Sequence, residues 1–206
     1  MGAHIASVEP TWSGCCEIVE EEVMKVTILN GNPDENNIAF EGHLDKLTDA
    51  LNSYNHSVTI FRLRNMDIKY CTGCFRCWME TPGKCVEEDE SGKICREYIN
   101  SNFVLFASLV VMGFPDALLK KAQEMLLPLV HPYPIFSDNE IQHLSRYDKY
   151  PPVGLLLEKG EDTDDQDIEI ITDIYQHHTF NSKDAFRFTK LTSDPLEEVV
   201  NEINRV

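Results

Sequence analysis

The sequence KVTILNGNP, at residues 25–33, sets a pattern that the rest of the chain repeats. Its first five residues form a β-branched apolar run, which predicts a buried strand, and the NGNP that follows is a turn cluster. Residues 36–51 then carry apolar side chains at close to helical spacing, which predicts a helix. The ordered part of the chain therefore begins with a strand, a loop and a helix.

The same alternation continues to residue 205. Further strands are predicted at residues 58–63, 103–107, 153–157 and 185–191, and further helices at residues 91–100, 117–127, 167–177 and 195–205. Continuous apolar runs such as FVLFA are typical of strands that are buried on both faces of a parallel sheet. We therefore expect an α/β fold with a doubly wound five-stranded parallel sheet, in the order 2-1-3-4-5, and helices on both faces.

The length of 206 residues suits one domain, which we expect to span residues 24–206. Residues 1–23 have no clear periodicity and are expected to be a poorly ordered N-terminal extension. The net charge of −17 argues against nucleic acid and anionic membrane as partners, because both are negatively charged. It also disfavours anionic cofactors unless backbone N–H groups hold them.

Cysteine usage and the N-terminal sequence indicate a cytoplasmic protein. The seven cysteines are clustered rather than spread, which favours a reducing compartment over a secreted disulfide framework. Residues 1–23 lack the basic start and the apolar run of a secretory signal. The longest apolar run, at residues 103–114, is too short to cross a bilayer.

Four of the cysteines lie in one short segment, CTGCFRCWMETPGKC, with the spacing C-x2-C-x2-C-x7-C. Spacing this short lets the thiolates of one loop turn toward a single point, where four of them suit an iron–sulfur cluster or zinc. Redox-active or purely structural thiols are the alternatives. The candidate metal ligands are Cys71, Cys74, Cys77 and Cys85.

In a sheet of this order, ligands bind beyond the carboxyl ends of the strands, at the point where the winding reverses. That point lies between the first and third strands. The loops at residues 30–37 and 108–115 flank it, and the cysteine loop leaves the second strand at the same edge. We expect the three loops to converge on one crevice.

Several segments together resemble the flavodoxin-like NAD(P)H-dependent FMN reductases, and among them the iron–sulfur flavoproteins. They are KVTILNGN at residues 25–32, LRNMDIK at 63–69, the cysteine loop, and Leu118-Leu119-Lys120, so that the resemblance covers roughly residues 24 to 200. It implies a flavodoxin fold, FMN at the switch point, NAD(P)H as electron donor, a [4Fe–4S] cluster on the four cysteines, and homodimers or homotetramers.

The loop that would hold the FMN phosphate departs from the family pattern. Relatives have Gly-Ser-Pro-Arg/Lys followed by hydroxyl residues, whereas this chain has GNPDENN, with two carboxylates and no basic residue. Backbone N–H groups and asparagine amides remain as donors. Asp34 and Glu35 lower FMN affinity if they point inward, or else they cap the helix. The predicted binding residues here are Asn30, Gly31, Asn32, Pro33, Asn36 and Asn37.

The loop after the third strand also departs, because it has LVVMG in place of the family's aromatic residues. The flavin ring is expected to pack on Val111 and Met112. Trp78 either covers the other face of the ring or packs the cysteine loop onto the body of the protein. The predicted binding residues here are Ser108, Leu109, Val110, Val111, Met112 and Gly113.

These features predict a redox protein in which NAD(P)H reduces the flavin and a small molecule or protein accepts the electrons. Such chemistry requires no catalytic acid or base from the chain. One alternative is a flavoenzyme whose cysteines hold no cluster. The other is a binding or scaffold protein that has lost FMN and keeps structural zinc or thiols.

Overall fold

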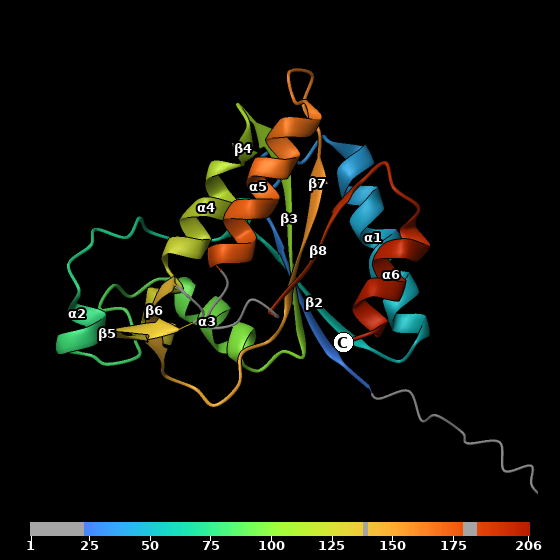
Figure 1. Cartoon of the computed structure of the whole chain (residues 1–206). Helices are drawn as coiled ribbons and strands as arrows, with labels where there is room; N and C mark the ends of the chain where they lie inside the picture. The colour runs from blue at the N-terminus through green and yellow to red at the C-terminus, as the bar shows by residue number, and fades with distance from the viewer. Residues whose placement is uncertain (1–22, 138–139, 179–184) are drawn as a thin grey trace, which may run out of the picture.

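A computed structural model describes residues 23–137, 140–178 and 185–206. The predicted N-terminal extension therefore lies outside the described residues, except for Val23. Within the described residues, five parallel strands form the central sheet in the order β2-β1-β3-β7-β8 (Figure 1). They are β1 (Lys25–Asn30), β2 (Ser57–Arg62), β3 (Phe103–Val111), β7 (Val153–Glu158) and β8 (Phe186–Leu191).

This order confirms the prediction of a doubly wound, flavodoxin-like sheet. Ile28 of β1 pairs in parallel with Ile60 of β2 on one side and with Leu105 of β3 on the other. The chain first adds a strand on one side of β1 and then crosses to the opposite side, so the winding reverses between β1 and β3. The carboxyl ends of these two strands define the edge where ligands bind in such sheets.

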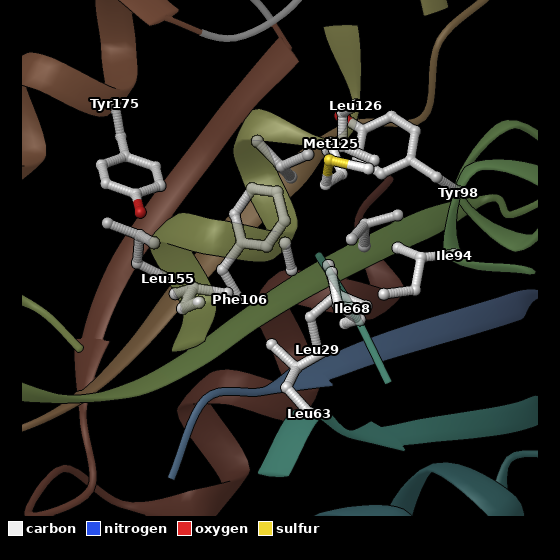
Figure 2. Close-up of a cluster of buried hydrophobic side chains, with 14 of the residues drawn as sticks. Leu29, Leu63, Ile68, Ile94, Tyr98, Phe106, Met125, Leu126, Leu155 and Tyr175 are labelled. Atoms are coloured by element: carbon white, nitrogen blue, oxygen red, sulfur yellow. The ribbon is translucent and has the colours of Figure 1, made fainter. Parts of the chain in front are cut away.

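Helices cover both faces of the sheet (Figure 1). Side chains of α1 and α6 pack on one face with Ile28 and Leu105, and those of α3, α4 and α5 pack on the other with Phe106 and Leu155. Figure 2 shows the second cluster, in which Phe106 lies among side chains from several helices and strands. Burial on both faces explains the continuous apolar runs in the sequence. The helices are α1 (Ile38–Ser53), α3 (Ser91–Ile99), α4 (Ala117–Glu124), α5 (Asp165–His178) and α6 (Leu196–Asn204).

The segment after β3 is a hairpin rather than the expected loop. β3 continues to Val111, and β4 (Phe114–Pro115) turns back to pair with it in antiparallel fashion. The two residues between them, Met112 and Gly113, have φ values of 52° and 74°. Positive φ at both positions is what a tight two-residue hairpin turn requires. The sequence lacks the usual Asn-Gly signal, because methionine stands at the first position.

The expected excursion at residues 131–152 contains a two-stranded antiparallel ribbon, β5 (Val130–Ser137) and β6 (Glu140–Ser145). The cysteine loop contributes the short helix α2 (Arg76–Met79), whose Trp78 contacts Val130 and His143 of this ribbon. We call α2, β5 and β6 together the side lobe; it projects beside the sheet (Figure 1). Two short 3-10 turns, η1 (Leu63–Asn65) and η2 (Leu127–Leu129), follow β2 and α4.

Each helix in the described part of the chain is too short or too polar to cross a membrane.

Candidate functional site

The loop after β1 closes on a carboxylate of the chain itself. Asn30 and Asn32 are fully buried, and their side-chain amides both donate to Oε1 of Glu41, at 2.9 and 2.8 Å. Asn32 also donates to the carbonyl of Asp34 at 2.8 Å. Glu41 lies in the first turn of α1, so these hydrogen bonds fix the loop to the helix that follows it.

Two arginines from the end of β2 and from η1 also bind Glu41. Arg64 donates to Oε1 at 2.8 Å and Arg62 to Oε2 at 3.1 Å. Burial alone would raise the pKa of Glu41, but the hydrogen bonds from Arg64, Asn30, Asn32 and Arg62 together lower this pKa to about 2. Glu41 is therefore a carboxylate at neutral pH, and it balances the charge of the arginines nearest the loop.

The predicted phosphate donors already have partners within the chain. Oδ1 of Asp34 accepts from the backbone N–H of Asn36 at 2.9 Å and from its side-chain amide at 3.0 Å. The amide of Asn37 donates to Oε2 of Glu158 at 2.6 Å, while its oxygen caps the N–H of Phe40. Oxygens of residues 30–37 accept from the backbone N–H groups of Asn32, Asp34, Asn36, Asn37, Ile38 and Phe40.

Gly31 brings the β1 loop into contact with β3 and α4. Its N–H donates to the carbonyl of Ala107 at 2.8 Å, which fixes the loop to β3. A Cβ added at Gly31 would lie 2.8 Å from the Cβ of Leu119 on α4, closer than side chains approach. The loop and the start of α4 therefore pack backbone against side chain, which only glycine permits.

Three of the six binding residues predicted at positions 108–113 belong to the last part of β3 and are buried or partly buried. Ser108 is fully buried; its hydroxyl donates to the carbonyl of Leu109 and accepts from the N–H of Asp116, both at 2.9 Å. Val110 is buried and Leu109 is partly buried. The turn is the accessible part, where Val111 is 49% exposed and Met112 is 99% exposed. The predicted apolar surface is thus restricted to the tip of the hairpin.

Carboxylates surround this edge of the sheet. Asp164 and Asp167 cap the start of α5 reciprocally, each accepting from the other's backbone N–H. Asp164 therefore caps α5, which begins at Asp165. A Cβ added at Gly113 would lie 2.9 Å from Oδ1 of Asp167, so a carboxylate contacts the hairpin turn directly. Lys159, the nearby cation, forms an ion pair with Asp165.

The carboxyl edge therefore fits one half of FMN better than the other. Its hairpin tip exposes the apolar side chains of Val111 and Met112, on which the flavin ring is predicted to pack. Its phosphate loop does not fit a dianion as it stands, because the donors described above are bonded internally and carboxylates lie among them.

The four cysteines of the cysteine loop line one small cavity of about 20 Å³, which is closed by residues from the end of α4 and from η2. Burial first, and then the neighbouring thiols of Cys85, Cys71 and Cys74, raise the pKa of Cys77. The four thiols thus line one cavity. The cavity has about the volume of one water molecule. Within the described residues, no three histidine, cysteine or carboxylate side chains are arranged to hold a metal ion.

The cysteine loop meets the β3–β4 hairpin at its start, where Cys71 and Gly73 line a cavity together with Phe114 of β4, whereas its helix α2 packs elsewhere. The indole N–H of Trp78 donates to the carbonyls of Leu127 and Val130, at 3.3 and 3.0 Å, and its ring lies 5.2 Å from that of His143. These contacts hold α2 against η2 and against the ribbon β5–β6, away from the β3–β4 hairpin (Figure 1). Of the two roles predicted for Trp78, packing the loop onto the body is the one observed.

A cavity of about 430 Å³ lies between α4, α5 and the start of the cysteine loop. Its lining is mostly aromatic and aliphatic and includes Tyr98, Phe106 and Phe114. Tyr175 and Gln123 supply polar atoms, and the tyrosine hydroxyl donates to the glutamine oxygen at 2.8 Å. Because Phe114 belongs to β4, one end of this cavity lies beside the hairpin.

Sequence reasoning missed Glu41, Arg62 and Arg64. A usable signal was present, since two arginines follow the apolar run of β2 and a glutamate begins the helix after β1. Parallel strands bring these positions to one edge, where opposite charges are expected to pair.

Solved structures share this fold. An NAD(P)H:quinone oxidoreductase from Methanothermobacter marburgensis has a TM-score of 0.60 at 14% identity, over 89% of this chain and 97% of that one. RosB, with a bound formylriboflavin phosphate, has a TM-score of 0.55 at 14% identity, over 89% and 74%. An FMN-dependent NADH-azoreductase from Bacillus anthracis, in complex with FMN, has a TM-score of 0.53 at 12% identity, over 88% and 94%. These similarities establish the flavodoxin-like fold. No protein-family model and no curated protein matches the sequence.

Proposed function

We propose that the chain is an oxidoreductase that binds a flavin at the carboxyl edge of its sheet and uses NAD(P)H as electron donor. The observation that carries this proposal is the position of an apolar hairpin tip beside the β1 loop, at the point where the winding of the sheet reverses. Oxidoreductases with the same fold, an NAD(P)H:quinone oxidoreductase and an FMN-dependent NADH-azoreductase, support it. A flavin supplies the hydride-accepting chemistry when bound.

The residues of the chain would position the ring and shield one of its faces. Val111 and Met112 present aliphatic and thioether groups, which pack well on an aromatic ring. The positive φ values of the turn hold Met112 outward, so that contact with a ring needs no rearrangement of the backbone. FMN is the flavin that the fold leads us to expect. Its phosphate would lie at the β1 loop, where the donors described above are bonded internally and carboxylates lie among them.

Nicotinamide oxidation with added flavin tests this proposal. The purified protein should oxidise NADH or NADPH in the presence of FMN or riboflavin and a quinone acceptor. Met112→Asp should weaken flavin binding, because it places a charge against the ring. Val23→Asp, at a residue that is 63% exposed before the amino end of β1, is the matched control and should bind flavin normally. A protein that binds neither flavin would favour the alternative of a scaffold.

The neighbouring cavity is the proposed site for the electron acceptor. Its aromatic and aliphatic lining suits a small aromatic molecule such as a quinone, and Tyr175 and Gln123 offer it hydrogen bonds. Ile174→Trp should fill the cavity and raise KM for the quinone with little effect on flavin affinity. An unchanged KM would place the acceptor elsewhere.

We further propose that the four thiols of the cysteine loop hold a [4Fe–4S] cluster or a zinc ion. Their gathering around one cavity supports this. Because no three side chains in the described part of the chain are arranged to hold a metal ion as they stand, either metal would require the thiols to turn inward. A cluster would also require the loop to open, since the cavity is only about 20 Å³. Anaerobic purification followed by iron and zinc analysis distinguishes the two, and Cys77→Ser should release either metal. Equal metal content in that variant and in the parent protein would contradict the proposal.

The side lobe is the proposed contact of a homodimer or homotetramer. Met79, Phe136 and Ile141 are each more than 70% exposed there. Chains with a net charge of −17 repel one another unless apolar surface drives their association. Light scattering should give a multiple of the chain mass for the parent protein and the monomer mass for Phe136→Asp. A monomeric parent protein would contradict this.

A further inference from the structure

We propose that the carboxylate of Asp34 in the β1 loop occupies donors that would otherwise bind a flavin phosphate. The site therefore favours a flavin without a phosphate, such as riboflavin, over FMN. This inference rests on the proposed function, because it concerns the ligand of the same site. Three observations support it: N–H groups of the loop are hydrogen-bonded within the chain, the nearest arginines are ion-paired, and the other charged groups around the loop are carboxylates.

The backbone N–H groups of Asn32, Asp34, Asn36 and Asn37 are bonded within the chain. In anion-binding loops of this kind, free backbone N–H groups at the start of a helix point at the phosphate. Here Oδ1 of Asp34 accepts from the N–H of Asn36, and Oδ1 of Asn37 accepts from that of Phe40. A phosphate oxygen that took the N–H of Asn36 would have to displace the Asp34 carboxylate and would then lie beside it.

The cations nearest the loop are ion-paired within the chain, although the Nε–H of Arg64 is buried without a hydrogen-bond partner among the residues that the structure describes. Arg64 donates to the carbonyl of Asn32 and to Glu41, and Arg62 donates to Glu41 and Asp45. Residues 30–37 contain no Arg or Lys, and the two arginines that approach the loop are paired with Glu41. A flavin phosphate would therefore gain no unpaired cation among the described residues of the loop.

The remaining charges around the loop are negative. Glu158 accepts from Asn37 at the base of the loop, Glu35 is exposed within it, and Asp164 and Asp167 lie at the start of α5. Such a surface repels a dianion. It suits the ribityl chain, because the hydroxyl groups of that chain are donors that carboxylate oxygens accept. The charge pattern thus matches an uncharged flavin that ends in hydroxyls.

The test is a pair of fluorescence titrations of the full chain, with riboflavin and with FMN, at low and high salt. We expect riboflavin to bind at least as tightly as FMN. We also expect FMN affinity to rise with salt, because salt screens repulsion between the phosphate and the carboxylates. A loop that attracts phosphate would show the opposite dependence, with FMN affinity falling as salt is added.

Asp34→Asn is the decisive variant, because the asparagine oxygen can still accept from the N–H of Asn36 while the charge is removed. It should tighten FMN binding about tenfold and change riboflavin binding less than about threefold. Asp49→Asn removes the same charge from an exposed position near the other end of α1 and is the control. It should leave both affinities unchanged.

The outcomes separate this inference from the proposed function. Wild-type protein that binds FMN ten times more tightly than riboflavin would overturn the inference and leave the flavoenzyme proposal standing. Unchanged FMN affinity in Asp34→Asn would overturn the role given to Asp34. Wild-type protein that binds neither flavin would overturn both proposals together.

Discussion

Replacing Glu41 by glutamine tests the charged cluster on which the β1 loop is built. The pKa of Glu41 is lowered from 4.5 to about 2, and each unit of pKa shift corresponds to about 1.4 kcal/mol. The ionised form of Glu41 therefore contributes up to about 3 kcal/mol to the free energy of unfolding at pH 7. Arg62 is 39% exposed, and solvent screens its part of the cluster, so we expect Glu41→Gln to cost about 2–3 kcal/mol.

The pH dependence of this cost identifies its origin. A carboxyl group whose folded-state pKa is lowered stabilises the fold above its unfolded pKa and loses that contribution as pH falls through the folded value. For Glu41 the loss should run from about pH 4.5 down to about pH 2. At pH 3 the contribution should have fallen to about 1 kcal/mol. The parent protein and Glu41→Gln should thus become more alike in stability as the solution is acidified.

Urea unfolding at pH 7 and at pH 3 measures these differences. Asp45→Asn is the matched control, because it removes a carboxylate that also binds Arg62 but is 63% exposed. An exposed pair of this kind contributes at most about 1 kcal/mol. A cost below about 1 kcal/mol for Glu41→Gln at pH 7, or an equal cost at both pH values, would refute the idea that its hydrogen-bonded charge holds the loop.

Three further experiments test the β1 loop and the hairpin by urea unfolding and the thiols by alkylation. Gly31→Ala should lower the free energy of unfolding by about 1–3 kcal/mol through the clash with α4, whereas Gly42→Ala, where the added Cβ meets nothing within 4 Å, should raise it by about 0.5–1 kcal/mol; equal effects would contradict the close approach. Met112→Asn should raise it by about 0.5–1 kcal/mol, because asparagine suits positive φ in a hairpin turn, and a loss would contradict that geometry. Burial raises the pKa of Cys95 to about 12, so iodoacetamide at pH 8 should label exposed Cys74 far faster than Cys95, as mass spectrometry would show, and similar rates would contradict that burial.

The sheet could be predicted from the sequence because its signals are local. Each apolar run, such as FVLFA, is long enough to be a strand buried on both faces, and the helices between the strands begin and end within about three residues of the expected positions. Alternation of strand and helix then leaves few possible topologies. The hairpin after β3 was missed because Met112 adopts a positive φ that methionine does not signal. The ribbon β5–β6 was missed because its strands contain prolines and histidines rather than a clear apolar alternation.

The site could be predicted only in part, because its residues are placed by contacts that the sequence does not show. The spacing of the four cysteines predicts that their thiols converge, and they line one cavity, but the direction of their loop depends on Trp78 and the side lobe. Composition shows that the phosphate loop carries carboxylates. Whether those carboxylates meet a ligand or the chain depends on Glu41 and on the two arginines that follow β2.

The internal bonding of the β1 loop has a consequence for the ligand-free protein. A loop whose donors await a phosphate leaves them unpaired until the ligand binds, and ligand binding then orders it. In this chain Asp34 and Asn37 already accept from the backbone, and Glu41 holds the buried amides. Flavin binding should therefore raise the melting temperature only by the amount that mass action predicts from the measured Kd. A larger rise would mean that the loop is disordered without flavin. Its carboxylates would then not occupy the N–H groups of the loop before the flavin binds.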